Sequence, residues 1–171
     1  MQQKYTSRNT SVNSTKLPAI YGRINWHKVR TEWYKTHNLL STPYVVDIGC
    51  GRYTANIKNY LSQYGIGYLG HDPYWGSDEG WDKVVPALII CSNVLNVIEE
   101  DDNIDSLIET IQGYNRPYYI TVYEGNGSGI GKVTKKDCYQ RNAKAASYCK
   151  GNQIVYKNTI TEPDYKVFLE K

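Results

Sequence analysis

Long apolar segments are absent from this chain of 171 residues. No run approaches the roughly 18 apolar residues that a transmembrane helix needs, and the first residues lack the apolar core of a secretory signal. We therefore expect no membrane-spanning segment and a cytoplasmic location.

Cysteine is also scarce, with four residues that lie far apart and form no CxxC pair. This spacing argues against a zinc site and against a disulfide framework, so reduced thiols and no bound metal are expected. The apolar fraction of 40% and the 17 tyrosines are typical of a folded globular protein.

Charge is unevenly distributed behind a net value of +3. Residues 1–36 carry seven Lys or Arg and one Glu, residues 37–131 carry four basic and twelve acidic residues, and residues 132–171 carry nine basic and four acidic ones. A basic patch formed by the two ends could hold a phosphate backbone. The alternative is a solvated surface with a flexible basic arm.

The chain divides into a flexible basic arm at residues 1–17 and a single domain at residues 18–171. Periodicity and turn residues predict helices over 23–37, 53–64 and 134–149, and a further helical face from Ile104 to Ile111 after the acidic run 99–102. They predict strands over 44–48, 67–71, 84–91 and 118–123, followed by a hairpin of 153–160 and 165–169. This order predicts a doubly wound α/β fold with a mostly parallel sheet and a C-terminal antiparallel hairpin.

The turn after the first predicted strand carries the sharpest functional signal. Its sequence is Asp47-Ile48-Gly49-Cys50-Gly51, and Asp72 ends the second strand. Two glycines let a backbone approach a ligand closely, and an acid after the second strand of such a sheet reaches ribose hydroxyls. The dinucleotide fingerprint needs a glycine three residues after Gly51, where Thr54 stands. The pattern favours a nucleoside other than NAD.

These motifs resemble class I S-adenosylmethionine-dependent methyltransferases. The likeness is greatest to the proteins classed as methyltransferases that are associated with DNA phosphorothioation, and to short phage-encoded relatives. It rests on Asp47 to Arg52, on Gly70 to Tyr74 and on Ser92 to Glu99. The expected terminal hairpin is similar too, because the last strand of that family is antiparallel.

The resemblance implies a cofactor site and a Rossmann-like methyltransferase sheet. Asp47, Gly49, Cys50 and Gly51 would line the methionine moiety, Asp72 would bind the ribose, Pro73 or Tyr74 would lie against the adenine, and Cys91, Ser92 and Asn93 would border the sulfonium. The chain departs from the family in two ways. Tyr53 replaces a third glycine, and only 14 residues separate Asp72 from the strand that begins at Ala87. We therefore expect the third strand to be missing and the second strand to form the sheet edge.

Candidate catalytic residues follow the later strands. Asn93 is one, with helix capping as the alternative, and Tyr123 and Glu124 are the others, beside a glycine-rich loop. His71 could act as a base or be structural. A cysteine nucleophile at Cys50 or Cys91 is disfavoured, because no Pro-Cys dipeptide is present and buried cysteines are common in cores.

A basic segment near the C-terminus is the candidate nucleic-acid interface. Its cations could contact phosphates while an aromatic ring stacks on a base, although a solvated helix face looks similar. The residues are Lys132, Lys135, Lys136, Tyr139 and Arg141.

The sequence thus predicts an S-adenosylmethionine-dependent methyltransferase that acts on a nucleic acid or nucleotide by direct methyl transfer. A protein partner could supply specificity, because little of the chain remains for recognition. The alternatives are a non-catalytic S-adenosylmethionine-binding module and a small-molecule methyltransferase.

Overall fold

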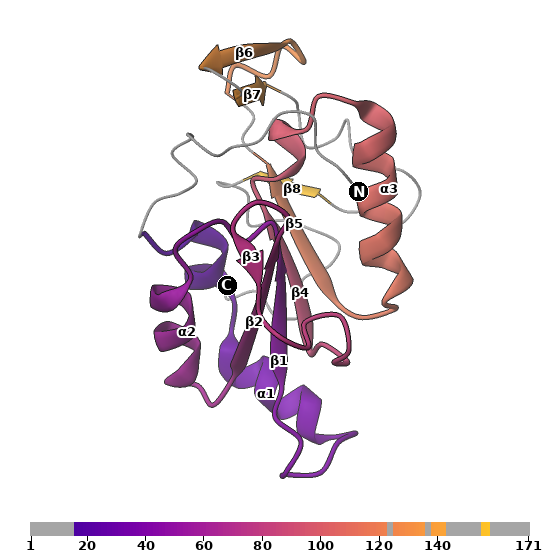
Figure 1. Cartoon of the computed structure of the whole chain (residues 1–171). Helices are drawn as coiled ribbons and strands as arrows, with labels where there is room; N and C mark the ends of the chain where they lie inside the picture. Colours follow the sequence, from indigo (N-terminus) through magenta and orange to yellow (C-terminus); the bar gives the residue numbers. More distant parts are fainter. Residues whose placement is uncertain (1–15, 123–124, 136–137, 143–154, 158–171) are drawn as a thin grey trace.

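The structure is a computed structural model that describes residues 16–122, 125–135, 138–142 and 155–157 (Figure 1). Two 3-10 helices, three α-helices and eight strands lie within these ranges. In chain order they are η2 (Ala19–Arg23), α1 (Trp26–Tyr34), β1 (Tyr44–Ile48), α2 (Ala55–Ser62), β2 (Gly67–Asp72), β3 (Gly76–Ser77), β4 (Leu88–Ser92), η3 (Leu95–Val97), α3 (Asp101–Gly113), β5 (Tyr118–Val122), β6 (Gly131–Lys135), β7 (Cys138–Arg141) and β8 (Val155–Lys157).

Six of the strands form one mostly parallel sheet with the order β3-β2-β1-β4-β5-β8. β1 lies between β2 and β4 and is parallel to both, with Val46 opposite Leu69 on one side and Ile89 on the other. Only β3 is antiparallel to its neighbour. Because the chain leaves β1 toward β2 and later returns on the other side at β4, the order of connection reverses between β1 and β4.

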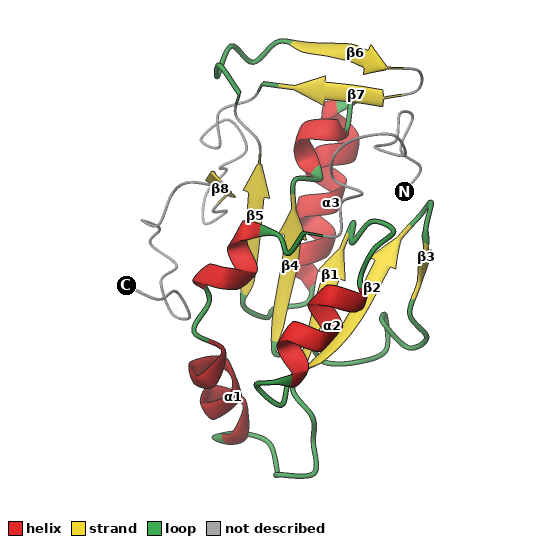
Figure 2. Ribbon diagram, turned by 90° about the vertical axis from the view of Figure 1, so that its left-hand side faces the viewer, coloured by secondary structure: helices red, strands yellow, loops and turns green. Residues whose placement is uncertain are grey.

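Helices cover both faces of this sheet (Figures 1 and 2). Residues that alternate along β1 and β4 divide between two apolar clusters, as the period of two in a strand requires. Val45, Leu88 and Ile90 pack toward η2, α1 and α2, whereas Val46 and Ile89 pack toward α3. The fold is therefore a three-layer α/β/α arrangement, as the sequence predicts.

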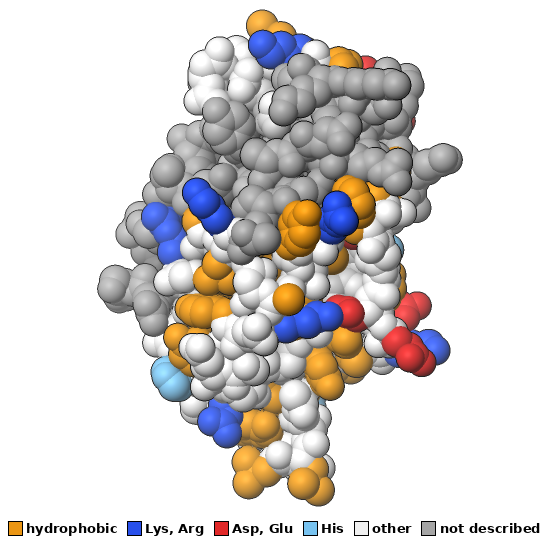
Figure 3. All heavy atoms as spheres, turned by 60° about the vertical axis from the view of Figure 1, so that its left-hand side comes forward, with side chains coloured by type: hydrophobic (Ala, Val, Ile, Leu, Met, Phe, Trp, Pro, Cys, Tyr) orange, Lys and Arg blue, Asp and Glu red, His pale blue; other side chains and the backbone are white. Residues whose placement is uncertain are grey.

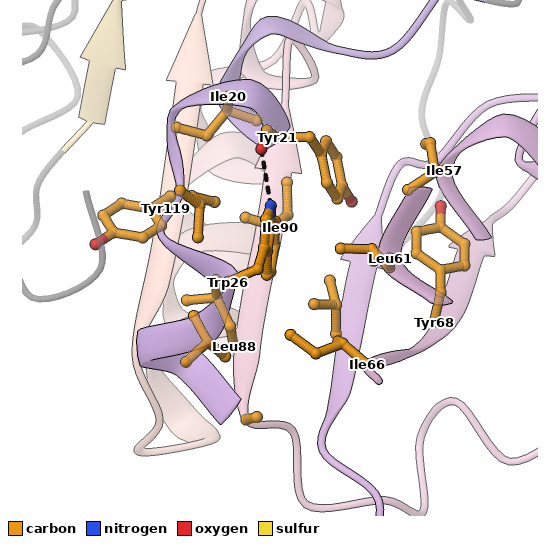
Figure 4. Packing of buried hydrophobic residues seen from close by; sticks show 14 of the residues in the cluster. Ile20, Tyr21, Trp26, Ile57, Leu61, Ile66, Tyr68, Leu88, Ile90 and Tyr119 are labelled. Carbon is orange, nitrogen blue, oxygen red and sulfur yellow. Dashed lines mark hydrogen bonds between the residues drawn. The ribbon is translucent and has the colours of Figure 1, made fainter. Parts of the chain in front are cut away.

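The larger aromatic side chains seal the face under α1 and α2 (Figure 4). Tyr21 and Trp26 are fully buried and stacked, with ring centroids 5.7 Å apart. The Trp26 indole nitrogen donates to the Tyr21 carbonyl at 2.8 Å, so this buried polar group is satisfied. The bond fixes η2, which the sequence pattern did not predict, against the start of α1.

The predicted helix boundaries hold to within a few residues. The Asn25 side chain caps α1 by accepting from the Lys28 amide at 3.1 Å. Gly65, the predicted stop of the second helix, has φ +70 three residues after α2 ends. The acidic residues Asp101 and Asp102 occupy the first turn of α3, where their negative charges interact favourably with the helix dipole.

The connection between β2 and β4 contains no parallel strand and no helix in residues 73–87, all of which are described. The third strand of the family arrangement is thus missing, as expected. The second strand is nevertheless not the edge, and that prediction is wrong. The two-residue strand β3 pairs with it, Asp72 opposite Gly76, because the chain turns back immediately after β2.

The predicted helix over residues 134–149 is wrong at its start. β6 and β7 form an antiparallel hairpin there, with Val133 opposite Tyr139. The Tyr139 ring covers Gly131, where any side chain would overlap the tyrosine hydroxyl. β7 also contacts η3, so tertiary packing outweighs the capping pattern at Thr134. Residues 143–149 lie outside the described part of the chain.

β8 falls within the predicted strand 153–160, but it pairs parallel with β5, Thr121 opposite Tyr156. The resemblance implied an antiparallel last strand, whereas this strand is parallel to its neighbour. The other hairpin strand, 165–169, lies outside the described residues, as do residues 1–15 of the predicted arm. Leu17 already packs against the core.

None of the helices in the described ranges has the length and apolar character needed to cross a membrane. The loop after α1 forms the lower tip of the molecule, and hydrophobic side chains cover that tip in Figure 3. Leu39 and Leu40 there are 81% and 95% exposed.

Candidate functional site

The glycine turn follows β1 and is hydrogen-bonded to the carboxyl end of β2. Gly49 and Gly51 have φ values of +77 and +73, a conformation that favours glycine. The amides of Gly49 and Cys50 both donate to the His71 carbonyl, at 2.7 and 3.2 Å. These bonds hold the turn against the end of β2, so its shape is fixed by the protein itself.

Gly49 is required for a second reason, which is packing. A Cβ at this position would lie 2.3 Å from the Val94 Cγ2 atom. Val94 follows β4, so its side chain fills the space directly above the turn. The glycine therefore permits a close contact within the protein, whether or not a ligand also approaches it.

Asp47 lies in the core beneath the turn. It is only 3% exposed, and one of its carboxylate oxygens, Oδ2, accepts from the hydroxyls of Tyr21 at 2.9 Å and Tyr68 at 2.8 Å. Burial raises the pKa of Asp47 to about 6, although both tyrosine hydrogen bonds oppose the shift. The carboxyl thus joins η2, β1 and β2 from the α1–α2 side, and it does not line the cavity described below.

Asp72 connects the turns that follow β1 and β2. Its Oδ2 atom accepts from the Gly51 amide at 3.0 Å, and its Oδ1 atom accepts from the amides of Tyr74 and Trp75 at 2.9 and 3.1 Å. A carboxylate has about four acceptor positions, so three amides leave room at Oδ2 for one more donor. This is the position from which a ribose hydroxyl could be bound.

A cavity of about 290 Å³ lies on the α3 side of these turns. The strands β1 and β2 contribute Ile48 and His71, the glycine turn contributes Gly49, and α3 contributes Leu107 and Thr110. Its remaining walls come from Pro73, Trp81 and Val94. The cavity lies at the carboxyl ends of the strands where the order of connection reverses, the usual ligand position in open α/β sheets. Its size is near the lower limit for ligand pockets.

His71 and Trp81 form an aromatic wall of this cavity. Their rings are stacked with centroids 3.9 Å apart, and the His71 Nδ1 atom lies 2.6 Å from the Ser77 hydroxyl. Burial lowers the pKa of His71 because the charged ring is the less stable form there, which favours the neutral ring near pH 7. The flat pair could contact a planar ligand.

The end of β4 places two of the predicted residues, Cys91 and Ser92, away from the cavity wall. Cys91 is fully buried in the α3 cluster, and burial raises the pKa of its thiol, which disfavours the reactive thiolate form. The Ser92 hydroxyl lies 2.9 Å from that of Thr121. Cys50 is likewise packed against Gly70, and burial raises the pKa of its thiol too.

Asn93 has the features of a strained residue at a site. Its φ is +59, rare for a residue with a side chain, and its amide donates to the Thr121 carbonyl at 2.8 Å. The side-chain oxygens of Asn93 and Asn96 are buried with no hydrogen-bond partner among the described residues. Asn93 does not cap a helix by its side chain, since η3 has no side-chain cap.

The other candidate catalytic residues, Tyr123 and Glu124, lie outside the described residues, so they stay predictions. Lys136 also lies outside them, and Lys135 ends β6. Lys132 is exposed.

The remaining two residues of the candidate nucleic-acid interface have structural contacts. Tyr139 is 9% exposed and covers Gly131. Arg141 donates to the Asp101 carboxylate at 2.7 Å and to the Glu99 carbonyl at 2.6 Å. The described part of the hairpin therefore does not present the stacking surface that the sequence suggested.

An exposed aromatic group does occur, on the two turns next to the cavity. The Arg52 guanidinium lies over the rings of Tyr53 and Trp75, 5.3 Å from each centroid. The sequence marked Tyr53 only as a departure from the family pattern, and no role was predicted for Trp75. The signal available was the density of aromatic residues immediately after each glycine turn.

No group of His, Cys, Asp or Glu in the described ranges is arranged to hold a metal ion. Comparison with known proteins identifies no relative, because no family model, no curated protein and no solved structure matches the chain.

Proposed function

We propose that this protein binds S-adenosylmethionine at the carboxyl ends of β1, β2 and β4 and transfers its methyl group to a nucleic acid or nucleotide. One observation carries the proposal: the cavity between the glycine turn, the β2–β3 turn and α3 coincides with the reversal of strand connection. Nucleoside cofactors occupy this position in open α/β sheets.

The residues present fit the nucleoside part of this cofactor. Asp72 retains an acceptor position at Oδ2 for a ribose hydroxyl, and the His71–Trp81 wall offers a flat surface for a base. Pro73, the residue after Asp72, lines the cavity, whereas Asp72 itself does not. Asp47 does not line the cavity, and in this proposal it supports the turn from the core through Tyr21 and Tyr68.

The sulfonium of the bound cofactor makes its methyl group electrophilic. The contribution of the chain is then to align the acceptor and exclude water. Asn93, with a strained backbone and a buried side-chain oxygen, is the described residue best suited to accept a hydrogen bond from an acceptor amine.

Titration calorimetry with S-adenosylhomocysteine tests binding, and Thr110→Trp tests the location. Thr110 is exposed at the cavity edge, so an indole there should obstruct the cavity without disturbing the core. Glu109→Trp is the matched control, because Glu109 is the exposed neighbour on the same helix and does not line the cavity. We expect binding to be lost in the first variant only, and equal behaviour of the two would contradict this location.

Transfer of labelled methyl from S-adenosylmethionine to single-stranded DNA, RNA, duplexes and free nucleotides tests turnover. Labelling of none of these, with cofactor binding intact, would contradict the methyltransferase proposal.

A binding module without turnover is the second candidate. Val94 favours it, because its side chain occupies the space above Gly49 where the methionine part would approach the turn. If the protein is such a module, we expect adenosine to bind as tightly as S-adenosylhomocysteine. A methyltransferase should bind S-adenosylhomocysteine more tightly than adenosine.

A further inference from the structure

Two adjacent leucines form an exposed apolar tip on the loop between α1 and β1. Leu39 and Leu40 are 81% and 95% exposed. They occupy the two central positions of a turn, because the Ser41 amide donates to the Asn38 carbonyl at 3.0 Å. Such positions usually carry Gly, Pro, Asn, Asp or Ser. At these exposures neither leucine packs against the core, so the apolar pair is open to a binding partner.

Hydrogen bonds within the loop and to α1 fix the shape of this leucine tip. The Asn38 side chain accepts from the Leu40 amide at 3.0 Å, and the Ser41 carbonyl accepts from the Trp33 indole nitrogen at 2.7 Å. Trp33 is 4% exposed, so the turn is joined to the core through α1. A group that is ordered before it binds loses less entropy on binding.

Positive charge predominates on the helix that leads to the leucine tip. Residues 26–41 carry Lys28, Arg30 and Lys35 but only one acidic residue, Glu32. Lys35 and Glu32 form an ion pair at 2.6 Å, which leaves the charges of Lys28 and Arg30. Both of these side chains are exposed, and neither lies within ion-pair distance of a carboxylate in the described ranges. The excess positive charge favours an anionic partner.

Arg116 adds a further positive charge from the segment before β5. Its guanidinium lies 5.6 Å from the ring centroid of Trp33, the residue that anchors the leucine tip. Its Nε atom donates to the Pro86 carbonyl at 2.7 Å, an acceptor without a net charge. The positive charge of Arg116 is therefore kept. In Figure 3 a Lys or Arg side chain lies next to the hydrophobic side chains of the tip.

An open hollow of about 350 Å³ lies on the exposed face of α1. Guanidinium, ammonium and hydroxyl groups line it, and all of these donate hydrogen bonds to phosphate oxygens. Lys35 follows the last residue of α1 and stands four residues before Leu39. The lining residues are His27, Arg30, Thr31, Tyr34 and Lys35. A hollow that suits a phosphate group thus adjoins the leucine tip along the chain.

These features fit a lipid membrane better than another protein. A stable protein interface buries about 800 Å² on each partner, whereas the leucine tip is a small protrusion at the lower end of the molecule (Figure 1). A second copy of the chain would bring like charges together, because a two-fold contact uses the same surface on both subunits. A bilayer with anionic headgroups accepts apolar side chains at its acyl boundary and attracts Lys and Arg at its surface.

We propose that the leucine tip inserts into the interfacial layer of an anionic phospholipid membrane, while the hollow on α1 holds a lipid phosphate group. The protein then lies on the bilayer surface and does not cross it. The leucine tip precedes β1, whereas the cavity beside the glycine turn lies beyond the carboxyl end of the same strand. The two sites are therefore separate, and the inference goes beyond the proposed function without depending on it.

Co-sedimentation with lipid vesicles tests the proposal on the complete protein. We expect binding to vesicles of equal parts phosphatidylcholine and phosphatidylglycerol to be tighter than binding to pure phosphatidylcholine by roughly 10-fold or more, because each cation near an anionic surface contributes roughly 5-fold. Binding should weaken as salt screens the surface charge. Equal binding to both kinds of vesicle would overturn the proposal.

The double variant Leu39→Ser with Leu40→Ser tests the tip. Both leucines are exposed, so the changes remove no core contact, and full burial of one leucine corresponds to roughly 10- to 100-fold in affinity. We expect the variant to bind anionic vesicles roughly 100-fold more weakly. Ile130→Ser with Val133→Ser is the matched control, since these residues are 69% and 53% exposed at the β6–β7 hairpin, at the other end of the molecule (Figure 1). Equal losses in the two double variants would contradict insertion of the tip.

Arg30→Gln and Arg52→Gln form a matched pair for the hollow. Each arginine is exposed and lies over a tyrosine ring, at 5.8 and 5.3 Å from the centroid. We expect Arg30→Gln to weaken vesicle binding by roughly 5-fold. Arg52→Gln should leave it unchanged, because Arg52 follows the glycine turn at the opposite end of β1. The same loss in both variants would show general charge attraction and overturn the role of the hollow.

Sedimentation velocity without lipid separates a bilayer from a second copy of the chain. We expect the sedimentation coefficient to be the same for the wild type and for the leucine double variant. Dimers of the wild type that this variant cannot form would overturn the proposal, because the leucine tip would then be a protein interface.

Discussion

The carboxyl group of Asp47 is an ionisable group with a large burial-induced pKa shift. It lies in the core with two tyrosine hydroxyls on one oxygen, and burial raises its pKa to about 6 from an ordinary value of 3.8. Folding therefore shifts the carboxyl toward its protonated form, which predominates in the folded state below about pH 6. This group stabilises the fold below pH 4, and the stabilisation is lost as the pH rises through 6.

The variant Asp47→Asn should remove this pH dependence, because an amide oxygen can still accept both hydroxyls without ionising. A difference of about two pKa units corresponds to roughly 3 kcal/mol. We expect the wild type to lose about this much unfolding free energy between pH 4 and pH 7, and the variant to be more stable than the wild type at pH 8. Urea denaturation across this pH range checks it, with Glu109→Gln as an exposed control. A parallel pH profile for Asp47→Asn and wild type would contradict the assignment.

Gly49 illustrates two separate demands on one residue. Its φ of +77 penalises any side chain, and Val94 occupies the place of a Cβ. Gly80 has a similar φ of +80, but nothing lies within 4 Å of a Cβ there. The pair therefore separates backbone strain from a packing clash.

We expect Gly80→Ala to cost about 1–2 kcal/mol, the penalty for the left-handed conformation. Gly49→Ala should cost roughly 1–3 kcal/mol more because of overpacking. Denaturant unfolding measures both, and Val94→Ala combined with Gly49→Ala should recover part of the additional loss. Equal losses of unfolding free energy in Gly49→Ala and Gly80→Ala would show that the Val94 side chain moves aside without an energetic penalty.

At the level of elements, the β6–β7 hairpin is attached to the start of α3 through Arg141. The guanidinium side chain is 16% exposed, whereas its partner Asp101 is 81% exposed. Exposed ion pairs contribute at most about 1 kcal/mol. The bond to the Glu99 carbonyl should matter more, because its loss leaves a backbone acceptor without this donor.

Arg141→Ala should therefore destabilise the hairpin more than Asp101→Asn does, by roughly 1–2 kcal/mol against less than 1 kcal/mol. Hydrogen exchange at the amides of residues 131–133 and 139–141 measures the effect locally. Unchanged protection in Arg141→Ala would show that Tyr139 packing alone holds the hairpin.

At the scale of the whole molecule, a ligand at the strand reversal should stabilise the complete domain. Binding to the folded state alone adds about 2.7 kcal/mol at a ligand concentration 100 times the Kd. For a domain of this size we expect S-adenosylhomocysteine to raise the Tm by about 5–10 °C. Thr110→Trp should abolish the increase and Glu109→Trp should keep it. An increase in both variants would place the ligand elsewhere.

Some features of the candidate site can be predicted from local sequence patterns, and others depend on tertiary packing. The glycine turn and Asp72 are adjacent in space because parallel strands bring their carboxyl ends to one edge, which the strand order alone predicts. The cavity wall could not be predicted in this way, since Trp81, Leu107 and Thr110 come from separate segments whose contacts depend on packing. The predicted helix after Thr134 was wrong for the same reason, because the contact of β7 with η3 is not local.

Local sequence patterns are sufficient to predict the α/β class, the positions of β1, β2, β4, α2 and α3, and the glycine turn after β1. Period, capping residues and glycines act over a few residues, so their consequences can be seen in the chain alone. Only the tertiary structure placed Asp47 in a tyrosine-bound core position, gave Asp72 its role between two turns, and brought Arg52, Tyr53 and Trp75 together. These arrangements depend on side chains that are distant in sequence, and packing, not propensity, decides which of them meet.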